Sequence, residues 1–572
     1  MVISPRPDCR WIVKQHDPEL ATRIGNEHGL PPLVSRLLVN RGIVDSGAIE
    51  AFLNPSLDNL HDPKLLPDYD EAVKQILSAR ELGHKIFIHG DYDVDGVTST
   101  ALFSRFLSKI GCDIISHVPH RMKEGYGIHI SVVDRAHEQG AKLFLTCDCG
   151  ASAIEQIIRA KELGMNVVVT DHHLLKENLP PADAIVNPHR SDSIYPYPNL
   201  SGVGVVFKLC AGITAELGHS LDHYYRAYLD LATLGTVADI MPLTGENRII
   251  VANGLERVQL SQKPGLRALI SKINLKGKLT TRNIGFNLGP RLNAAGRIDD
   301  AALSLKLMLA TEDDVAMEIA DQLEALNNER RSEQERVVAE AMEMVGASED
   351  FDLPLVILAK EGWHEGLVGL MAGNLVKEYY RPAFVARIMD GEAKGSARSI
   401  PGFHLADALN RVGHLLNSHG GHELAAGFSM DIENFDEFKR LLLEDAAKVL
   451  SPELLVRTLT IDAETTIRET NLDSLAQLAR LEPYGQANPE PLFLARGVKL
   501  SHTMPMKDPS HVRAVFSDGR KNIVTGVGFG IAPLFEGISP GDTVSVVFTT
   551  EIDTYGGKES AKWMIKDVMK ES

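Results

Sequence analysis

The sequence predicts an α/β protein in which a parallel-sheet domain and a second α/β domain are joined by a long helix and followed by a C-terminal β-barrel. Three observations lead to this fold class. Residues 85–188 alternate apolar strands with helical segments, and residues 300–347 are strongly helical. From about Val456 the pattern changes to short strands separated by turns such as Asp518-Gly519. The first pattern is typical of a parallel sheet and the last of a small barrel.

The alternating region predicts five strands and the helices between them. Helical segments include Val97–Leu107 and Ala151–Leu163, the latter ended by Gly164. Alternation of this kind implies a parallel sheet with helices on both faces, and ligand groups then gather at the carboxyl ends of the strands. The predicted strands are Lys85–Ile88, Asp113–Val118, Lys142–Thr146, Val167–Thr170 and Ala184–Val186.

Later segments supply the remaining elements. A helix over Leu221–Val237 leads to Asp239, and Leu355–Ala359 is predicted to be a buried strand that opens the second α/β region. The long helix presents an apolar face made of Val315, Ile319, Leu323 and Leu326. Oligonucleotide-binding architecture is one candidate for the barrel. The barrel strands are predicted at Leu492–Leu500, Val512–Phe516, Ile523–Phe529 and Thr543–Thr550.

Length, charge and cysteine content limit the class of protein. A chain of 572 residues has room for about three or four domains. The net charge of −18 argues against a general polycation that coats nucleic acid, but not against a nucleic-acid enzyme with local basic patches. The five cysteines fit a reducing compartment. Neither a signal peptide nor a membrane-spanning run is found, so we expect a cytoplasmic protein without membrane contact.

The segment His89–Gly96 is the most informative stretch of the chain. It places Asp91, Asp93 and Asp95 at alternate positions directly after an apolar strand and before an apolar helix. Like charges crowded into one turn repel each other unless cations are held there. A solvent-facing turn would explain one Asp-Gly, but not this pattern, so the segment predicts a divalent metal site.

Two other predicted strands end in residues of the same kind. Asp148 follows the strand at 142–146, and Asp171-His172-His173 follows the strand at 167–170. Parallel strands bring their carboxyl ends to one edge of the sheet, so three strands deliver carboxylate or imidazole groups to one place. Adjacent histidines in a solvent-facing loop are the alternative, and the shared edge favours metal ligation.

These motifs resemble the DHH phosphoesterase superfamily, which is named for the tripeptide at 171–173. Within it, the match is close to bacterial exonucleases specific for single strands, and it covers nearly the whole chain. The tripeptide alone is a weak signal, whereas the ordered set of motifs is specific. The motifs are His89–Gly96, Thr146–Gly150, Asp171–His173, Gly235–Asp239 and, in the associated second domain, Gly420–His422.

The resemblance implies roles for the residues of the predicted metal site. It assigns Asp148 the position between two Mn²⁺ or Mg²⁺ ions. His89 and Asp91 match the first motif as additional ligands or as residues that orient the ligands, and His173 would contact the scissile phosphate or assist proton transfer. The implied ligands are Asp93, Asp95, Asp148, His172 and Asp239.

Candidate phosphate-binding residues lie elsewhere. The segment 282–297 carries three arginines and no acid, so Arg291 and Arg297 are candidates, although such arginines can instead pair with distant acids. The resemblance implies that Arg121 and the Ser396/Arg398 pair grip a 5′ phosphate, because a planar guanidinium and a hydroxyl suit that group. It also implies that His422 contacts the substrate.

The barrel offers aromatic residues for stacking on bases. Phe516, Phe529 and Trp563 are candidates, with nearby Arg513, Arg520 and Lys521 for the phosphates. One face of each barrel strand must be buried, so about half of these aromatic residues are expected in the core.

The resemblance implies a processive 5′-to-3′ exonuclease that degrades single-stranded DNA to mononucleotides in DNA repair and recombination. It further implies a monomer, with a single-strand-binding protein and a RecQ-type helicase as candidate partners. A small-substrate DHH phosphatase or oligoribonuclease is one alternative, which the region after Val456 disfavours. A non-catalytic DNA-binding scaffold is the other, and the intact ligands disfavour it.

The expected domains are an N-terminal segment (1–60), a DHH catalytic domain (61–260), a connecting helical region (261–347), a DHHA1 domain (348–455) and the barrel domain (456–572).

Overall fold

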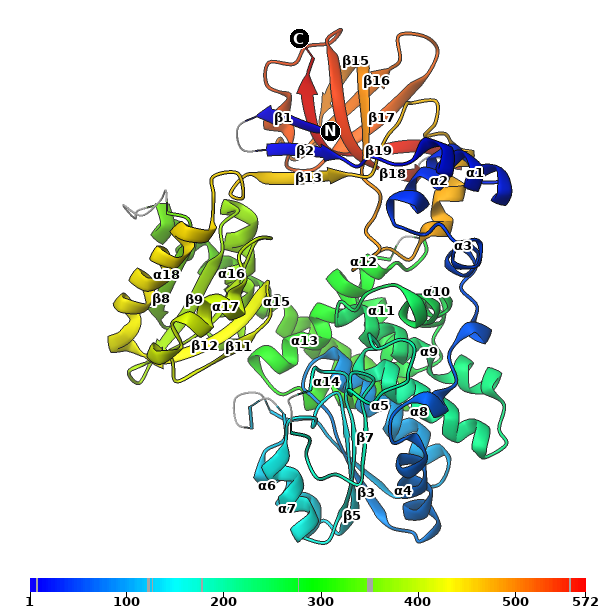
Figure 1. Cartoon of the computed structure of the whole chain (residues 1–572), viewed down its shortest axis with the longest axis vertical. Coiled ribbons are helices and arrows are strands. Elements are labelled where there is room, and N and C mark those ends of the chain that lie inside the picture. The colour runs from blue at the N-terminus through cyan, green and yellow to red at the C-terminus, as the bar shows by residue number, and fades with distance from the viewer. Residues whose placement is uncertain are drawn as a thin grey trace. The chain divides into compact units, whose positions relative to one another are not determined.

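The computed structural model describes residues 1–6, 9–120, 124–125, 127–175, 178–275, 277–346, 353–554 and 557–571. The chain divides into two compact units (Figure 1). The first comprises residues 1–49, 331–480 and 490–572, and the second comprises residues 50–330 and 481–489. None of the helices among the described residues is long and apolar enough to cross a membrane.

The second unit is built on a five-stranded sheet in the order β4-β3-β5-β6-β7. Every neighbouring pair is parallel, as the sequence predicts. Each predicted strand end lies within one residue of the observed one. The strands are β3 (Lys85–His89), β4 (Ile114–His117), β5 (Ala141–Cys147), β6 (Asn166–Thr170) and β7 (Ala184–Val186).

Helices cover both faces of this sheet (Figure 1). Side chains alternate along each strand, so Ile86 and Ile88 pack on one face while Phe87 packs on the other. The first face is covered by α4 (Tyr69–Glu81), α5 (Val94–Lys109) and α8 (Gly202–Glu216). The second is covered by α6 (Ile130–Glu138) and α7 (Ile154–Glu162). With both faces buried, the carboxyl edge of the sheet is left to hold a site.

A group of helices completes the second unit. The segment 481–489 is tied to it, because Arg248 donates to the carbonyl oxygens of Leu481 and Glu482, and Leu243 N donates to Gln486 O at 2.8 Å. The helices are α9 (Leu221–Ala238), α10 (Gly245–Gln259), α11 (Pro264–Ser271), α12 (Thr281–Asn283), the π-helical turn η3 (Ile284–Leu288), α13 (Gly289–Ile298) and α14 (Ala302–Leu309).

The long helix is confirmed, but its bounds and its apolar face differ from the prediction. The helical region 300–347 contains two helices, α14 and the 34-residue α15 (Asp313–Gly346). Val315 is 45% exposed, whereas Ala316, Ala320 and Leu323 are buried, so the predicted face is wrong by one residue at its start. Both sets of positions fit a 3.6-residue period, and the sequence pattern favoured the larger side chain over the alanines that pack closely.

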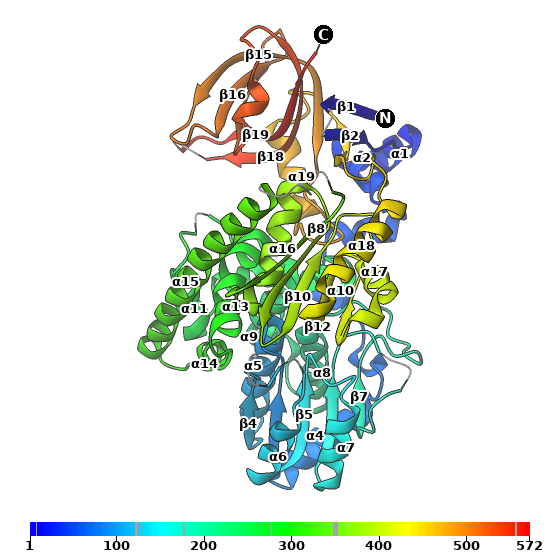
Figure 2. The same cartoon turned by 90° about the vertical axis from the view of Figure 1, so that its left-hand side faces the viewer.

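The first unit contains the second α/β domain (Figure 2). Its sheet has the order β11-β12-β10-β9-β8, and of these neighbours only β8 and β9 are parallel. Helix α16 (Glu365–Tyr379) covers one face, and α17 (Leu405–Arg411) and α18 (Phe435–Val449) cover the other. The strands are β8 (Val356–Glu361), β9 (Ala383–Met389), β10 (Glu392–Arg398), β11 (Ser418–Gly421) and β12 (Ala425–Asp431).

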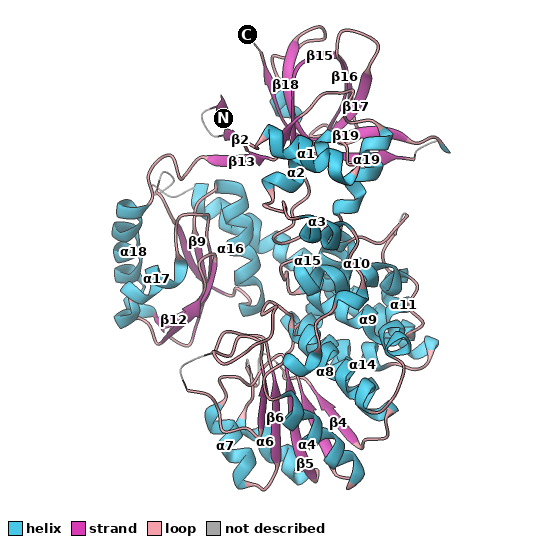
Figure 3. Ribbon diagram, turned by 45° about the vertical axis from the view of Figure 1, so that its right-hand side comes forward, coloured by secondary structure: helices cyan, strands magenta, loops and turns pink. Residues whose placement is uncertain are grey.

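The C-terminal barrel is confirmed and is closed by pairing of its first and fourth long strands, β15 and β18 (Figure 3). The sequence pattern missed β19, whose alternation is interrupted by the buried Asp567. The rings of Phe516 and Trp563 are fully buried, so these two candidates belong to the share expected in the core, whereas Phe529 is 57% exposed. The strands are β14 (Ala463–Glu464), β15 (Phe493–Pro505), β16 (Val512–Ser517), β17 (Ile523–Gly528), β18 (Thr543–Asp553) and β19 (Ser560–Lys570).

The N-terminal residues pack with the barrel. Strands β1 (Val2–Arg6) and β2 (Cys9–Val13) form a small sheet with β13 (Arg457–Ile461), and they are followed by α1 (Pro18–His28), α2 (Pro32–Asn40) and α3 (Ser46–Leu53). Trp11 is fully buried and donates from Nε1 to Asp567 Oδ2 at 2.8 Å. This bond accounts for the buried carboxylate in β19.

Replacing Leu323 with alanine tests which face of α15 is buried. We expect the free energy of unfolding to fall by about 2–5 kcal/mol, because the change leaves a cavity in the core of the second unit. Val315→Ala, on the exposed side of the same helix, is expected to change it by less than about 0.5 kcal/mol. Chemical denaturation of the full chain measures both, and equal losses would contradict the observed face.

Candidate metal centre

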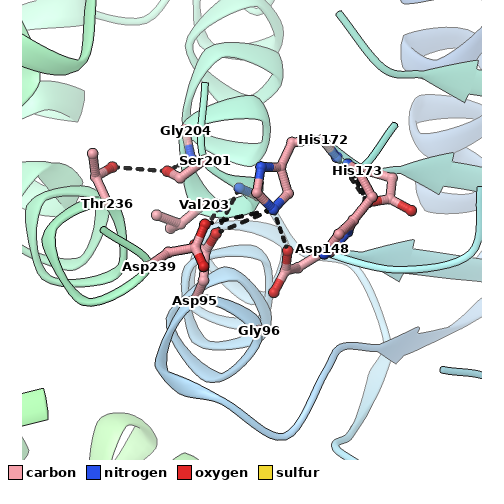
Figure 4. Close-up of polar contacts among 12 residues, drawn as sticks. Asp95, Gly96, Asp148, His172, His173, Ser201, Val203, Gly204, Thr236 and Asp239 are labelled. Carbon is pink, nitrogen blue, oxygen red and sulfur yellow. Dashed lines mark hydrogen bonds and ion pairs between the residues drawn. The ribbon is translucent and has the colours of Figure 1, made fainter. Parts of the chain in front are cut away.

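Three strands of the parallel sheet and the end of one helix bring acidic and imidazole groups together. The aspartate turn follows β3, Asp148 follows β5, and the Asp171–His173 motif follows β6. Asp239 stands at the C-terminal end of α9. Figure 4 shows Asp95, Asp148 and Asp239 around the ring of His172.

Asp93 caps the N-terminus of α5. Its Oδ1 accepts hydrogen bonds from the backbone N–H groups of Asp95 at 2.9 Å and Gly96 at 3.1 Å. Its backbone is extended, as is usual for a cap, and the positive end of the helix dipole stabilises its negative charge. The cap therefore fixes the direction in which this carboxylate points.

Asp95 lies two residues after Asp93, in the first turn of α5, and is fully buried. Its Oδ2 accepts from Gly202 N at 2.7 Å and its Oδ1 from Val203 N at 2.8 Å, so it binds the first turn of α8. Burial, together with the negative charge of Asp93, raises its pKa to about 7, although these two hydrogen bonds oppose the shift. The ionised form of this carboxylate needs a nearby cation.

Asp148 has the most constrained position in the cluster. Its φ of 60° lies in the left-handed region, which is unfavourable for a residue with a Cβ and is concentrated at functional sites. Its buried Oδ1 accepts no hydrogen bond from the described residues and lies 3.1 Å from His172 Nε2. Burial and the charges of Asp95 and Asp93 raise its pKa well above the usual range. The buried Oδ1 of Asp148 is therefore suited to bind a cation.

The ring of His172 faces three carboxylates. Its Nε2 lies 3.1 Å from Asp148 Oδ1, 3.7 Å from Asp239 Oδ2 and 3.9 Å from Asp95 Oδ2. Burial, followed by the charge of His173, lowers the pKa of His172 to about 4, so the neutral imidazole offers a lone pair. Burial and the charge of Asp95 raise the pKa of Asp239 to about 9.

The donor atoms form three overlapping groups, each with its ligand atoms within 4.8 Å of one another. Asp148 belongs to two of the groups, and so does His172. Carboxylate oxygens with imidazole nitrogen suit Mn²⁺ or Mg²⁺, and overlapping groups suit two neighbouring ions. The residues present therefore fit the predicted cation pair. The groups are Asp91/Asp93/Asp148, Asp95/His172/Asp239 and Asp148/His172/His173.

Asp171 orients both histidines, a role that the sequence did not assign. The buried carboxylate accepts from the backbone N–H groups of His172 at 2.7 Å, His173 at 3.1 Å and Ala151 at 2.9 Å. Its Oδ1 also lies 2.8 Å from His173 Nδ1. Burial lowers the pKa of His173, but the bond to Asp171 and its charge outweigh burial and raise that pKa to about 9. The position of Asp171 at the strand end, directly before two histidines, was the available signal.

His89 lies at the end of β3 but does not belong to the three groups. Its Nδ1 is 3.0 Å from His117 Nδ1, and its Nε2 is 3.2 Å from Gly127 O. Burial lowers its pKa to about 3, so the ring is neutral. Of the two roles left open by the sequence, this geometry favours the orienting role over metal ligation.

Glycines allow α8 and α9 to approach the carboxylates. A Cβ on Gly202 would lie 2.5 Å from Asp148 Oδ1, and a Cβ on Gly235 would lie 2.8 Å from Asp95 Oδ1. The two helices are also joined by a hydrogen bond of 2.8 Å between Ser201 Oγ and Thr236 Oγ1 (Figure 4). A side chain at either glycine would displace a cluster carboxylate.

The predicted phosphate-binding residues of the second unit differ in their surroundings. Arg121 lies outside the described residues. Arg291 forms an ion pair with Glu324, with 3.1 Å between Nη2 and Oε1. This is the alternative given above, in which an arginine of this segment pairs with a distant acid instead of a phosphate. Arg297 lies in the last turn of α13, and a Cβ on the adjacent Gly296 would be 2.9 Å from Tyr92 O in the aspartate turn. Arg297 thus directly follows a residue that packs on the aspartate turn, whereas Arg291 has an acidic partner.

The other predicted substrate contacts lie in the first unit. Ser396 and Arg398 are two residues apart on β10, so they share a face of the sheet. A Cβ on Gly369 of α16 would lie 3.3 Å from Arg398 Nη2 and 3.5 Å from Ser396 Oγ, so both side chains pass beside that glycine. Burial lowers the pKa of Arg398. His422 is exposed in the turn after β11.

Gly202→Ala tests the close approach to Asp148. We expect the affinity for Mn²⁺ to fall roughly 10- to 100-fold, because the new Cβ displaces a carboxylate that the cluster shares. The matched control is Gly373→Ala on α16, where a Cβ meets no atom within 4 Å. Isothermal titration with Mn²⁺ measures both variants, and unchanged affinity in Gly202→Ala would contradict the proposed geometry.

Cation binding is expected to stabilise the fold. Mn²⁺ at 100 times its dissociation constant should raise the free energy of unfolding by about 2.7 kcal/mol. Asp148→Asn should lose most of this gain and be at least as stable as the parent chain without cations, because one repelling charge is removed. Thermal unfolding with Mn²⁺ or with chelator measures the effect. A variant that is less stable in chelator and still responds to Mn²⁺ would contradict this role for Asp148.

Comparisons with known proteins agree with the observed domains. Residues 85–236 match the DHH family N-terminal domain, residues 352–448 the DHHA1 domain and residues 461–567 the RecJ OB domain. The chain is 35% identical to the single-stranded-DNA-specific exonuclease RecJ of Bacillus subtilis over 98% of its own length and 70% of that protein. It is also 35% identical to the exonuclease of the same name from Salmonella typhimurium, over 94% of this chain and 96% of that protein.

Solved structures lead to the same family. The crystal structure of RecJ from Thermus thermophilus in complex with Mn²⁺ is 28% identical, with a TM-score of 0.85 over 99% of this chain and 80% of that chain. A second structure of exonuclease RecJ, bound to manganese, is 33% identical with a TM-score of 0.58, over 68% of this chain and 96% of that chain. The family resemblance inferred from the motifs is therefore confirmed: this chain belongs to the RecJ family of single-stranded-DNA-specific exonucleases.

Proposed function

We propose that this chain is a processive 5′-to-3′ exonuclease that degrades single-stranded DNA to mononucleotides in DNA repair and recombination. The observation that carries the proposal is the set of overlapping ligand groups that share Asp148 and His172. Membership of the RecJ family supplies the substrate class. The metal ligands proposed are Asp93, Asp95, Asp148, His172 and Asp239, with Asp91 beside them.

The chemistry follows from the donor set. When bound, a pair of Mn²⁺ or Mg²⁺ ions would activate a water molecule and neutralise charge on the phosphate under attack. Asp171 holds His173 through Nδ1, which leaves Nε2 as the atom that contacts the scissile phosphate or transfers a proton. His89 supports the end of β3 through His117 and Gly127 rather than reacting itself.

Recognition of the 5′ end is assigned to arginines and a hydroxyl. Arg398 makes a bond of 2.8 Å from Nη1 to Ala397 O and runs beside Ser396, so guanidinium and hydroxyl lie on one face. This pair suits a terminal phosphate. Arg121, Arg297 and His422 are proposed as further contacts. Arg291 is a weaker candidate because Glu324 binds it.

The barrel is proposed to hold the incoming strand. Phe529 is exposed, and the ring of His511 lies edge-on to it with 5.0 Å between the ring centroids. Exposed aromatic and basic side chains on a barrel of this kind suit single-stranded nucleic acid.

We further propose that the protein acts as a monomer in the cytoplasm, with a single-strand-binding protein and a RecQ-type helicase as partners.

A cleavage assay tests the function. With Mn²⁺, we expect release of mononucleotides from 5′-phosphorylated single-stranded DNA, and little or none from a duplex or a dinucleotide. Asp148→Ala should abolish release, while Asp222→Ala, a surface residue paired with Arg226, should not. Cleavage of the dinucleotide alone would indicate a small-substrate phosphatase or oligoribonuclease. Binding of DNA without any cleavage would indicate a scaffold.

A further inference from the structure

An exposed aromatic residue and an exposed arginine share one side of a helical segment in the second unit. Phe286 is 76% exposed in the π-helical turn η3, and Arg282 is exposed in α12. Phe286 is four positions after Arg282, which places the two side chains about one turn apart on one side. Gly285 beside them is also exposed. We call Arg282, Gly285 and Phe286 the α12–η3 surface.

The segment that carries this surface is firmly held. Ile284 and Leu288, on either side of Phe286, are fully buried in the core of the second unit. Thr280 and Asn283 form a capping box at the start of α12, and Thr281 Oγ1 donates to Tyr484 O at 2.6 Å. Single π-helical turns are rare and occur often at functional sites. Phe286 is therefore a ring presented to solvent by an ordered element.

The α12–η3 surface adjoins the metal-binding residues. Gly289, directly after η3, packs on the end of α9, where a Cβ on Gly289 would lie 3.7 Å from the Cβ of Ala238. Asp239 is the next residue after Ala238. Figure 1 shows α9 and α13, and Figure 4 shows Asp239 at the cluster.

A second exposed apolar side chain follows Asp239 directly. Ile240 is 71% exposed, and its φ of 57° lies in the left-handed region, where a β-branched residue is strained. Backbone bonds hold this conformation, from Ile240 N to Val237 O at 3.2 Å and from Met241 N to Thr236 O at 3.3 Å. These two bonds form the C-terminal cap of α9, and the cap presents the apolar side chain of Ile240 to solvent directly beside a cluster carboxylate.

The basic and aromatic side chains of the α12–η3 surface indicate which kind of ligand it could bind. Segment 280–298 contains arginines and no acidic residue, in a chain of net charge −18, and Arg282 makes no ion pair with the described residues. A single strand of DNA alternates anionic phosphates with flat bases. A stacking ring next to a cation matches that alternation without reading the sequence.

We propose that the α12–η3 surface and Ile240 bind a nucleotide of the DNA strand next to the scissile phosphate. Phe286 stacks on its base, Arg282 pairs with a backbone phosphate and Ile240 makes an apolar contact to the same nucleotide. The proposal rests on the function proposed above, since it takes single-stranded DNA as the substrate.

The test compares base-bearing strands with strands whose 5′-terminal nucleotides are abasic. Phe286→Ala should raise KM for the base-bearing strand roughly 5- to 100-fold. The parent chain should prefer the base-bearing strand by a similar factor, and the variant should lose that preference. Phe286→Tyr should retain it. Leu82→Ala, at a 64% exposed site of the same unit, is the matched control and should behave as the parent chain.

Arg282→Ala separates the two kinds of contact. It should weaken binding of both strands equally and lower the dependence on salt concentration by about one phosphate contact. Affinities measured by fluorescence anisotropy in chelator give the same comparison without cleavage, so loss of the proposed activity is distinguishable from loss of this inference. A Phe286→Ala variant with an unchanged preference for bases would overturn the proposal. So would a lowered melting temperature without a change in affinity, because the ring would then pack against another part of the chain.

Discussion

Repulsion between buried carboxylates is the constraint on which the active-site half of this structure depends. Asp95 and Asp148 are almost fully buried at one edge of the sheet, and Asp239 lies close to both. Burial and the charges of their neighbours raise the pKa of each. The ionised carboxylates repel one another in an empty site, and bound cations would remove this repulsion. The folded chain is therefore expected to bind metal ions.

The surrounding elements serve to hold that cluster in place. The N-termini of α5 and α8 supply backbone donors to Asp93 and Asp95, which offsets part of the repulsion. Asp171 fixes the two histidines, and Gly202 lets α8 pass close to Asp148. The parallel sheet is what brings these residues, far apart in sequence, to one edge. Hydrolysis of a phosphodiester is the chemistry that this arrangement suits best.

Much of the fold follows from local patterns in the sequence, and the misses have physical reasons. The strands of the parallel sheet are short apolar runs between clear turns, so they were predicted to within a residue. The buried face of α15 begins at Ala316 rather than at Val315, because small alanine side chains pack closely at its start. The burial of Trp563 and Asp567 could not be predicted locally, because their hydrogen-bond partners, Thr470 and Trp11, lie far away in the sequence. In the site, the aspartate turn and the strand ends predict a metal site, and the family resemblance implies which residues are its ligands, whereas the orienting role of Asp171 becomes clear from its hydrogen bonds.

We propose above that the carboxylate cluster holds two cations that share Asp148. Anomalous diffraction from crystals grown with Mn²⁺ tests it most directly. We expect two manganese peaks roughly 3.5–4 Å apart, both within coordination distance of the Asp148 carboxylate. A single peak, or peaks that do not contact Asp148, would show that the cluster does not hold a shared cation pair.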